Sequence, residues 1–159
     1  MTSLLSKANE ALSQQKDLVN PRWYPRYHLA PPTGWMNDPN GLSWFDGYYH
    51  AFYQHYPWQP VWGPMHWGHA RSRDMVNWEH LPIALAPEGP EDKDGCFSGS
   101  AVVEGNKLAL IYTGHKFDGE ANEENLYQVQ CLATSTDGIH FERQGMILDT
   151  PRGVHHFRD

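Results

Sequence analysis

Residues 70–79 read ARSRDMVNWE, and residues 133–142 read ATSTDGIHFE. The two stretches share the skeleton Ala-x-Ser-x-Asp-x-x-x-aromatic-Glu, and each leads into a short apolar run, at residues 83–85 and 146–148. The offset between the copies is 63 residues, from position 70 to position 133. Each copy follows a segment that reads as a β-hairpin, so one repeat unit comprises about four strands. Radial repetition of four-stranded units is the pattern of a β-propeller, here with longer loops than the common repeats of roughly 40–50 residues. The alternative is a coincidental Ser-x-Asp turn.

The chain between the hairpins also reads as strands and turns. Asp46-Gly47 lies between two aromatic-rich segments, and a two-residue hairpin turn needs φ > 0 at both positions. No segment of helical periodicity and useful length follows residue 20. The expected elements are a hairpin of strands 41–45 and 48–54, a hairpin over 98–113 that turns at 104–106, and strands at 66–72 and 126–135.

The first residues have a different pattern. Leu4, Leu5, Ala8, Ala11 and Leu12 recur at helical spacing. With Ser3 as the N-cap, this pattern predicts a short amphipathic helix over residues 3–16 that lies on the main domain, the alternative being a frayed tail. We therefore divide the chain into an N-terminal helical extension, residues 1–20, and an all-β domain, residues 21–159.

Composition excludes several classes of protein. The 159 residues are 40% hydrophobic and 19% charged, which is typical of a folded domain, and the net charge of −7 argues against a nucleic-acid or anionic-membrane surface. Two cysteines, Cys96 and Cys131, are too few for a disulfide framework, so we expect two buried thiols in a reducing compartment. Residues 1–16 contain no apolar run long enough for a signal peptide, and no stretch approaches a membrane span. A cytoplasmic location is the expectation.

Residues 34–41, GWMNDPNG, bring together several side chains suited to binding or catalysis. Pro39 restricts Asp38 to an extended conformation, and the flanking glycines allow strained backbone angles. Trp35 offers a flat face suited to a sugar ring or to a core, while Asn37 and Asn40 can hold a carboxylate or bind hydroxyls. The plain alternative is a tight turn that uses Asp and Asn as turn residues.

The WMNDPNG motif resembles the signature of glycosyl hydrolase family 32, the invertases and sucrose-6-phosphate hydrolases. Three later pieces match the family in the same order: Tyr53-Gln54 with Trp62-Gly63, Phe97-Ser98-Gly99-Ser100, and Phe157-Arg158-Asp159. The likeness runs from about residue 24 to residue 159 and is closest to bacterial cytoplasmic sucrose or sucrose-6-phosphate hydrolases. It implies an all-β fold, a five-bladed β-propeller. At a period of 63 residues the chain would hold only the first two to three blades, without the later blades and the C-terminal β-sandwich.

The resemblance also implies the chemistry. It indicates cleavage of the β-fructofuranosidic bond of sucrose or sucrose-6-phosphate with retention of configuration and without a cofactor. Retention requires two carboxyl groups, a nucleophile and an acid/base, about 5–5.5 Å apart. The resemblance assigns Asp38 as nucleophile and Asp159 as the stabiliser of the transition state. The implied substrate-binding residues are Trp35, Met36, Asn37, Asp38, Gln54, Trp62, Phe97, Ser98, Arg158 and Asp159. Taken alone, Phe97 reads more simply as a core residue, and Arg158-Asp159 as a surface turn or ion pair.

The acid/base is not found in the sequence. In the family it is the Glu of a Glu-Cys pair, whereas here Cys96 follows Gly95 and Cys131 follows Gln130. Because general acid catalysis contributes roughly 10²–10⁴-fold, the 159 residues alone are expected to be inactive or nearly so.

Three other functions stay open. A sugar-binding module would keep the aromatic cleft without the chemistry, and a fructosyltransferase of the same fold would pass the fructosyl group to a sugar instead of water. A propeller scaffold for protein partners would leave Asp38 and its neighbours unexplained. We expect no metal site, because His66 and His69 lie three apart on a strand and would face opposite sides. The expected partner is a small sugar, not nucleic acid or membrane, and the oligomeric state is open.

Overall fold

The computed structural model describes residues 2–158. Helix α1, Leu4–Gln15, begins as expected at Ser3, whose Oγ accepts a hydrogen bond from the Ser6 N–H at 3.1 Å, and a 3-10 turn, η1, follows at Lys16–Leu18. The helix packs against the first sheet, where the Ile83 N–H donates to Asn9 Oδ1 at 2.8 Å. The expected N-terminal helix is therefore present, and the Asn9 side chain attaches it to the backbone of the β domain.

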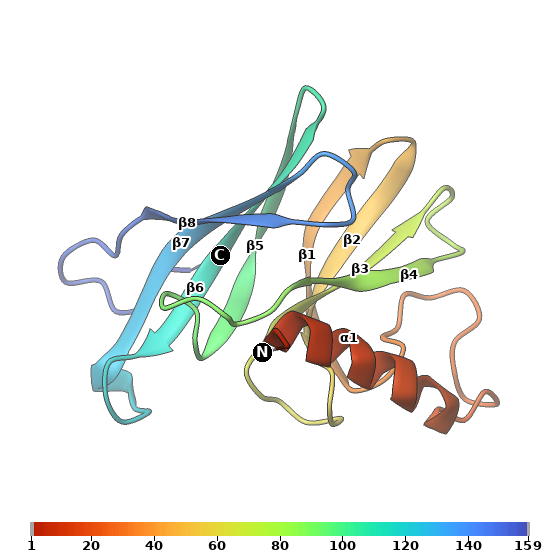
Figure 1. Cartoon of the computed structure of the whole chain (residues 1–159), viewed down its shortest axis with the longest axis horizontal. Helices are drawn as coiled ribbons and strands as arrows, with labels where there is room; N and C mark the ends of the chain where they lie inside the picture. Colours follow the sequence, from red (N-terminus) through yellow and green to blue (C-terminus); the bar gives the residue numbers. More distant parts are fainter. Residues whose placement is uncertain (1, 159) are drawn as a thin grey trace.

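Eight strands form two four-stranded antiparallel sheets, each with its strands in chain order (Figure 1). The first sheet comprises β1 (Trp35–Phe45), β2 (Tyr48–Tyr56), β3 (His66–Ser72) and β4 (Glu79–Leu85). The second comprises β5 (Gly95–Glu104), β6 (Lys107–Phe117), β7 (Leu126–Ser135) and β8 (Glu142–Leu148), with a 3-10 turn, η2, at Glu123–Asn125. The innermost strands β1 and β5 lie against each other. The described residues contain no strand of a third sheet, so they hold two blades where two to three were expected.

Strand positions follow the expected pattern with one main correction. The strands predicted at 66–72 and 126–135 have those bounds, and both hairpins are present with longer arms. The first strand, however, begins at Trp35, whereas the sequence predicted a strand from residue 41. The WMNDPNG motif therefore lies within β1 and not in a turn before the hairpin. Pro39 is tolerated there because β1 is an edge strand and its register is interrupted beside the proline.

The two repeat copies form the same turn at equivalent places, between β3 and β4 and between β7 and β8. Ser72 Oγ donates to Asp74 Oδ1 at 2.9 Å, and Ser135 Oγ donates to Asp137 Oδ1 at the same distance. Each aspartate then accepts two backbone N–H bonds at 2.8–2.9 Å from the residues two and three positions on. Hydrogen bonds hold the pKa of both carboxyls well below the ordinary value, chiefly the bond from the Asn77 N–H to Asp74 and the bond from the His140 ring to Asp137. The sequence repeat is thus a structural repeat.

The hydrophobic core lies between the two sheets. Trp67 is fully buried at its centre, and its indole N–H donates to the Phe97 carbonyl at 3.1 Å, which joins the sheets by a polar contact inside the apolar layer. Cys96 and Cys131 belong to this core as free, buried thiols, as expected. The core residues are Phe45, Phe52, Trp67, Ala84, Leu85, Cys96, Leu108, Leu110, Tyr112, Val129, Cys131 and Ala133.

The buried histidines of β3 take part in packing. His69 stacks on Phe52 with ring centroids 4.1 Å apart, and its Nε2 lies 2.9 Å from His50 Nδ1. His66 Nδ1 lies 2.9 Å from the Pro64 carbonyl. Burial lowers the pKa of His66 to about 4, so the ring is neutral at physiological pH.

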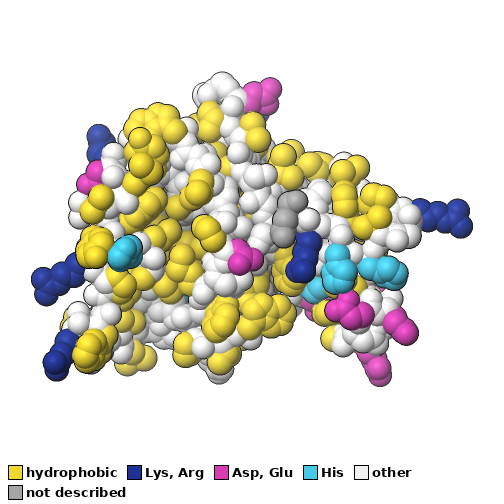
Figure 2. Space-filling model, turned by 180° about the vertical axis from the view of Figure 1, so that it is seen from behind, with side chains coloured by type: hydrophobic (Ala, Val, Ile, Leu, Met, Phe, Trp, Pro, Cys, Tyr) yellow, Lys and Arg dark blue, Asp and Glu magenta, His cyan; other side chains and the backbone are white. Residues whose placement is uncertain are grey.

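The surface shows how charge is distributed. Lys and Arg side chains stand apart from one another on the face drawn in Figure 2, where several acidic and histidine side chains lie together at one end and others are scattered. None of the helices in residues 2–158 has the length and apolar character that a bilayer crossing requires. Exposed aromatic side chains, Trp23 and Tyr27, lie on the segment between α1 and β1.

Candidate active site

The site begins with two interruptions of strand pairing. In β1 the register shifts between Asn37 and Pro39, and in β5 it shifts between Phe97 and Gly99. Asp38 and Ser98 are therefore the extra, unpaired residues of two β-bulges on the neighbouring inner strands. In a regular strand successive side chains point to opposite faces, whereas a bulge turns the extra side chain away from that alternation.

The two bulges bring consecutive residues into one hollow. Asn37 and Asp38 from β1 and Phe97 and Ser98 from β5 line a cavity of about 160 Å³. The remaining lining residues are Gln54, Trp62, Met65 and Arg158. A second hollow of about 300 Å³ continues from Asp38 and Ser98 along the inner strands, past Pro39, Asn40, Gly99 and Ser100. Seven of the expected site residues thus meet at one place.

Asp38 and Ser98 contact each other directly. The Ser98 hydroxyl donates to Asp38 Oδ2 at 3.2 Å, across a sequence separation of 60 residues. The Asp38 side chain is exposed to the hollow, and no hydrogen bond reaches its other oxygen, Oδ1, within residues 2–158. Asp38 is also the one carboxylate among the described lining residues. The arrangement presents a single oriented carboxylate oxygen to a ligand.

The other residues of the WMNDPNG motif surround this carboxylate on β1. Trp35 Nε1–H donates to Asn37 Oδ1 at 2.7 Å, which orients the amide of Asn37. Trp35 and Met36 are half-buried on β1 and are not among the residues that line this hollow, so their role in substrate binding stays a prediction. Asn40 is buried with an unpartnered Nδ2, and it makes no hydrogen bond to Asp38. The sequence had suggested that Asn40 could hold the carboxylate.

Gln54, Trp62 and Phe97 also line the hollow. Gln54 is buried, and its amide nitrogen donates to the Cys96 carbonyl at 3.0 Å, so its oxygen is the end left for a ligand. Trp62 is 58% exposed and meets Phe97 edge-to-face with centroids 6.3 Å apart. Phe97 is half-buried and lines the hollow, so it is not simply a core residue. An exposed indole at the rim is suited to stacking on a sugar ring.

Arg158 reaches the hollow from the end of the described chain. The Phe157 N–H donates to Gln128 Oε1 at 3.1 Å, and the Phe157 carbonyl accepts from Gln130 Nε2 at 3.0 Å. These two glutamines of β7 hold the segment on both sides of its backbone and place the Arg158 guanidinium beside the hollow of Asp38. Asp159, the expected transition-state stabiliser, lies outside the described residues.

Three residues around the hollow were not predicted from the sequence. His115 of β6 stacks on Phe97, with centroids 4.0 Å apart and planes 14° from parallel, and its Nδ1 lies 3.3 Å from Gln128 Nε2. Burial lowers the pKa of His115 to about 4. Met65 also lines the hollow. None of the three belongs to a recognisable motif, and only the β6–β7 register could have pointed to His115 and Gln128.

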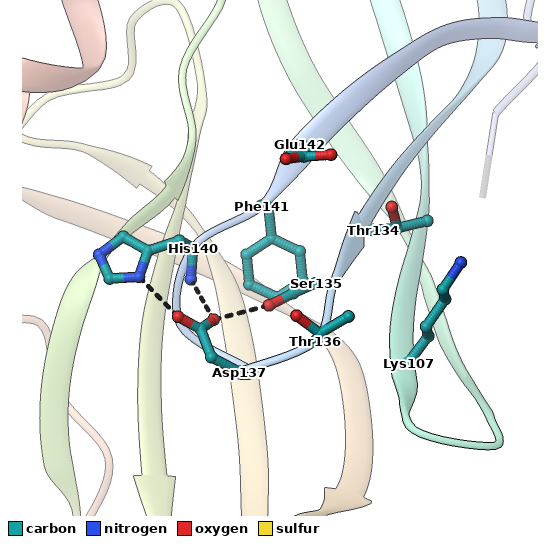
Figure 3. A pocket seen from close by; sticks show the side chains of 8 residues that line it. All are labelled: Lys107, Thr134, Ser135, Thr136, Asp137, His140, Phe141 and Glu142. Atoms are coloured by element: carbon teal, nitrogen blue, oxygen red, sulfur yellow. Dashed lines mark hydrogen bonds and ion pairs between the residues drawn. The ribbon is translucent and has the colours of Figure 1, made fainter.

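A larger hollow of about 350 Å³ lies elsewhere, at the β7–β8 turn (Figure 3). Three of its lining residues form the repeat turn: Asp137 is bonded to Ser135 and to both the backbone and the ring of His140. The first sheet builds the same turn with Asn77 in the place of His140. Because this set recurs as a turn in both sheets, we assign it a structural role.

Known proteins share this architecture. The model of the glycosyl hydrolases family 32 N-terminal domain matches residues 28–159. Sucrose-6-phosphate hydrolase of Escherichia coli is 60% identical over 158 residues, which cover 99% of this chain and 33% of that protein. The solved structure of a Bombyx mori GH32 β-fructofuranosidase superposes with a TM-score of 0.86 and 45% identity, over 96% of this chain and 32% of that one. A mutant of the same enzyme in complex with sucrose gives a TM-score of 0.83 at 44% identity, over 92% and 31%.

The chain thus spans about a third of the length of the relatives it matches. The family model covers most of the chain, and the two four-stranded sheets are blades of the β-propeller that these relatives share. The chain belongs to glycosyl hydrolase family 32.

Proposed function

We propose that this chain forms part of a retaining β-fructofuranosidase, a glycosidase that hydrolyses sucrose or sucrose-6-phosphate. The observation that carries this proposal is the pair of bulges that turns Asp38 and Ser98 into one hollow with Trp62 and Arg158. The printed names of the relatives support the substrate class: one is a sucrose-6-phosphate hydrolase, and another is a β-fructofuranosidase whose mutant was solved with sucrose.

In the proposed reaction, Asp38 is the nucleophile. Its Oδ1 attacks the anomeric carbon of the fructosyl unit, the glycosidic bond breaks, and the leaving oxygen takes a proton from a general acid. Water then attacks the fructosyl-enzyme ester, the former acid accepts the proton, and the carboxylate is released. The Ser98 hydroxyl at 3.2 Å holds Oδ2 and keeps Oδ1 directed at the substrate.

Binding groups surround the nucleophile on three sides. We assign substrate hydroxyls to the oriented amide of Asn37 and to the free oxygen of Gln54, and sugar stacking to the exposed Trp62. Arg158 supplies a positive charge and up to five donors to the same hollow. No described residue supplies the acid, because Asp38 is the one carboxylate among the described lining residues. We also propose Asp159 as the stabiliser of the transition state.

The test compares two Asp→Asn variants in the longest polypeptide that contains this chain. Asp38→Asn should abolish fructose release from sucrose and from sucrose-6-phosphate while binding persists. Asp46→Asn is the matched control: Asp46 has φ 47° in the β1–β2 turn, and Asn-Gly suits this turn as well as Asp-Gly. With methanol present, the active protein should yield methyl β-fructofuranoside, since double displacement retains configuration.

Each outcome separates one alternative. If Asp38→Asn keeps wild-type turnover, the nucleophile assignment is wrong. Sugar binding without any turnover in the unmodified protein favours the sugar-binding module. Transfer of fructosyl groups to sucrose in preference to water favours the fructosyltransferase. The ratio of kcat/KM for the two substrates decides between sucrose and sucrose-6-phosphate.

We further propose an N-terminal helical extension, residues 1–20, beside a catalytic propeller domain that begins at residue 21. A cytoplasmic location fits Cys96 and Cys131, which are free thiols that a reducing compartment would preserve. The scattered cations of Figure 2 fit a small-sugar partner better than a nucleic acid.

A further inference from the structure

We propose that His115 and Gln128 are positioning residues that set the separation between the two walls of the Asp38 hollow. One wall is the bulge that carries Phe97 and Ser98, and the other is the segment that carries Phe157 and Arg158. This inference rests on the proposed function and adds to it residues that no motif of the chain contains.

A continuous set of contacts joins the two walls. Phe97 stacks face-to-face on His115, whose Nδ1 lies 3.3 Å from Gln128 Nε2. Gln128 in turn accepts the Phe157 N–H on Oε1 at 3.1 Å. His115 and Gln128 are 3% and 1% exposed and are direct partners in the β6–β7 register, so water does not replace either contact. Arg158 follows Phe157 by one residue, so its side chain starts from a backbone that Gln128 fixes.

The hydrogen-bond pattern determines the state of the imidazole. Because Gln128 Oε1 accepts the Phe157 N–H, the amide must turn its NH₂ toward His115. His115 Nδ1 must then accept, which leaves the proton on Nε2 and the ring neutral. A protonated ring would place an Nδ1–H against the amide NH₂, and the contact between the walls would be lost.

The charges around His115 come from several elements. Asp94 and Glu123 raise its pKa, whereas Arg158 and His156 lower it, and burial is the largest cause of the net decrease to about 4. The histidine therefore keeps one charge state through the neutral range. A group with a steady charge and a fixed tautomer is suited to hold a wall in place.

Two substitutions separate positioning from simple packing. His115→Phe keeps a ring against Phe97 but removes the acceptor for Gln128, so the amide NH₂ loses its partner. In Gln128→Glu the carboxylate can still accept the Phe157 N–H. The bond to His115 Nδ1 reverses, because the carboxylate has no N–H and only His115 can then donate. We expect His115→Phe to lower kcat/KM for sucrose by about 10–100-fold, since a displacement near 1 Å can cost roughly 10²-fold. Gln128→Glu keeps both contacts and should lower kcat/KM less than His115→Phe does.

Nitrogen NMR of the His115 ring provides a readout that packing alone does not change. The unmodified protein should show the Nε2–H tautomer, and Gln128→Glu should show an Nδ1–H with a raised pKa. Gln144→Glu, on the exposed part of β8, makes the same change in charge and should leave His115 unchanged. If His115→Phe does not fold, the Gln128→Glu spectrum still decides, and an unaltered tautomer there overturns the proposal.

The two proposals fail in different ways. Wild-type kcat/KM in His115→Phe, with Asp38→Asn inactive, would overturn the positioning role and leave the proposed function intact. Turnover by Asp38→Asn would overturn the proposed function itself. A reduced kcat/KM in His115→Phe together with the tautomer switch in Gln128→Glu supports the positioning role.

Discussion

The ion pair between Arg143 and Asp92 joins strand β8 to the loop that connects the two sheets. The Asp92 side chain is completely buried, and that of Arg143 is 24% exposed. Asp92 also accepts hydrogen bonds from the Tyr112 hydroxyl at 2.9 Å and from the Gly89 N–H at 2.8 Å, and Arg143 Nη1 donates to the Ala86 carbonyl at 2.7 Å. The pair therefore locks the loop against the second sheet from inside the core.

Replacing Arg143 by Met should strongly destabilise the protein. Removing one partner of a buried pair leaves a buried charge and costs about 3–5 kcal/mol. The three hydrogen bonds that Asp92 keeps, from Gly89, Tyr112 and the Cys96 thiol, place the expected loss near the lower end, about 3 kcal/mol, as does the partial exposure of Arg143. For a chain of this size that corresponds to a fall in Tm of about 6–12 °C. Urea unfolding followed by tryptophan fluorescence measures it.

A double substitution and a surface control test the physical reason. Asp92→Asn combined with Arg143→Met removes both charges and should recover at least about 1 kcal/mol relative to Arg143→Met alone, since buried pairs often exchange neutrally for uncharged groups. Arg71→Met breaks the exposed pair with Glu79, whose carboxylate is 57% exposed, and should cost at most about 1 kcal/mol. Equal losses in Arg143→Met and Arg71→Met would refute the argument from burial.

Three other substitutions or conditions make further predictions. Met75 has φ 59° where the second repeat has Gly138, so Met75→Gly should raise the free energy of unfolding by about 0.5–1 kcal/mol, while Met75→Ala should not, as urea titration would show. At Gly68 an added Cβ would lie 2.1 Å from a tyrosine ring, so Gly68→Ala should destabilise by about 2 kcal/mol or more, seen as a lower Tm or insoluble protein. Burial lowers the pKa of His55 and His66 to about 4, so the unfolded chain binds more protons below pH 6.5. The free energy of unfolding should therefore be highest above pH 6.5 and fall by about 1 kcal/mol per histidine per pH unit toward pH 4. A free energy of unfolding that stays constant over that range would contradict this prediction.

Local chemistry made much of the fold predictable. The Ser-x-Asp turns are encoded within a few residues, because the serine and aspartate side chains satisfy the backbone N–H groups that follow them. The same locality applies to the Asp46-Gly47 hairpin. The bounds of β3 and β7 were also predicted correctly from the turn residues beside them. A repeat of turns at fixed spacing was therefore sufficient to predict stacked four-stranded sheets.

Features that depend on pairing between distant segments were not predictable in the same way. Nothing in the sequence marks Asp92 as the buried acid among its neighbours, because its partner Arg143 lies 51 residues later. The start of β1 was predicted too late for a similar reason: a stretch with a proline, an aspartate and glycines reads as a turn unless β2 is there to pair with it. The roles of His115 and Gln128 likewise depend on the register of β6 and β7.

The bulges explain why the site lies where it does. Asp38 and Ser98 are separated by 60 residues, close to the 63-residue period of the repeat, and each is the extra residue on the first strand of its sheet. The two bulges are therefore equivalent features of successive blades. Because the first strands of neighbouring blades lie side by side, each added residue turns toward the same hollow. The repeat that builds the scaffold therefore also delivers one polar side chain per blade to the hollow, and the two meet there in a hydrogen bond.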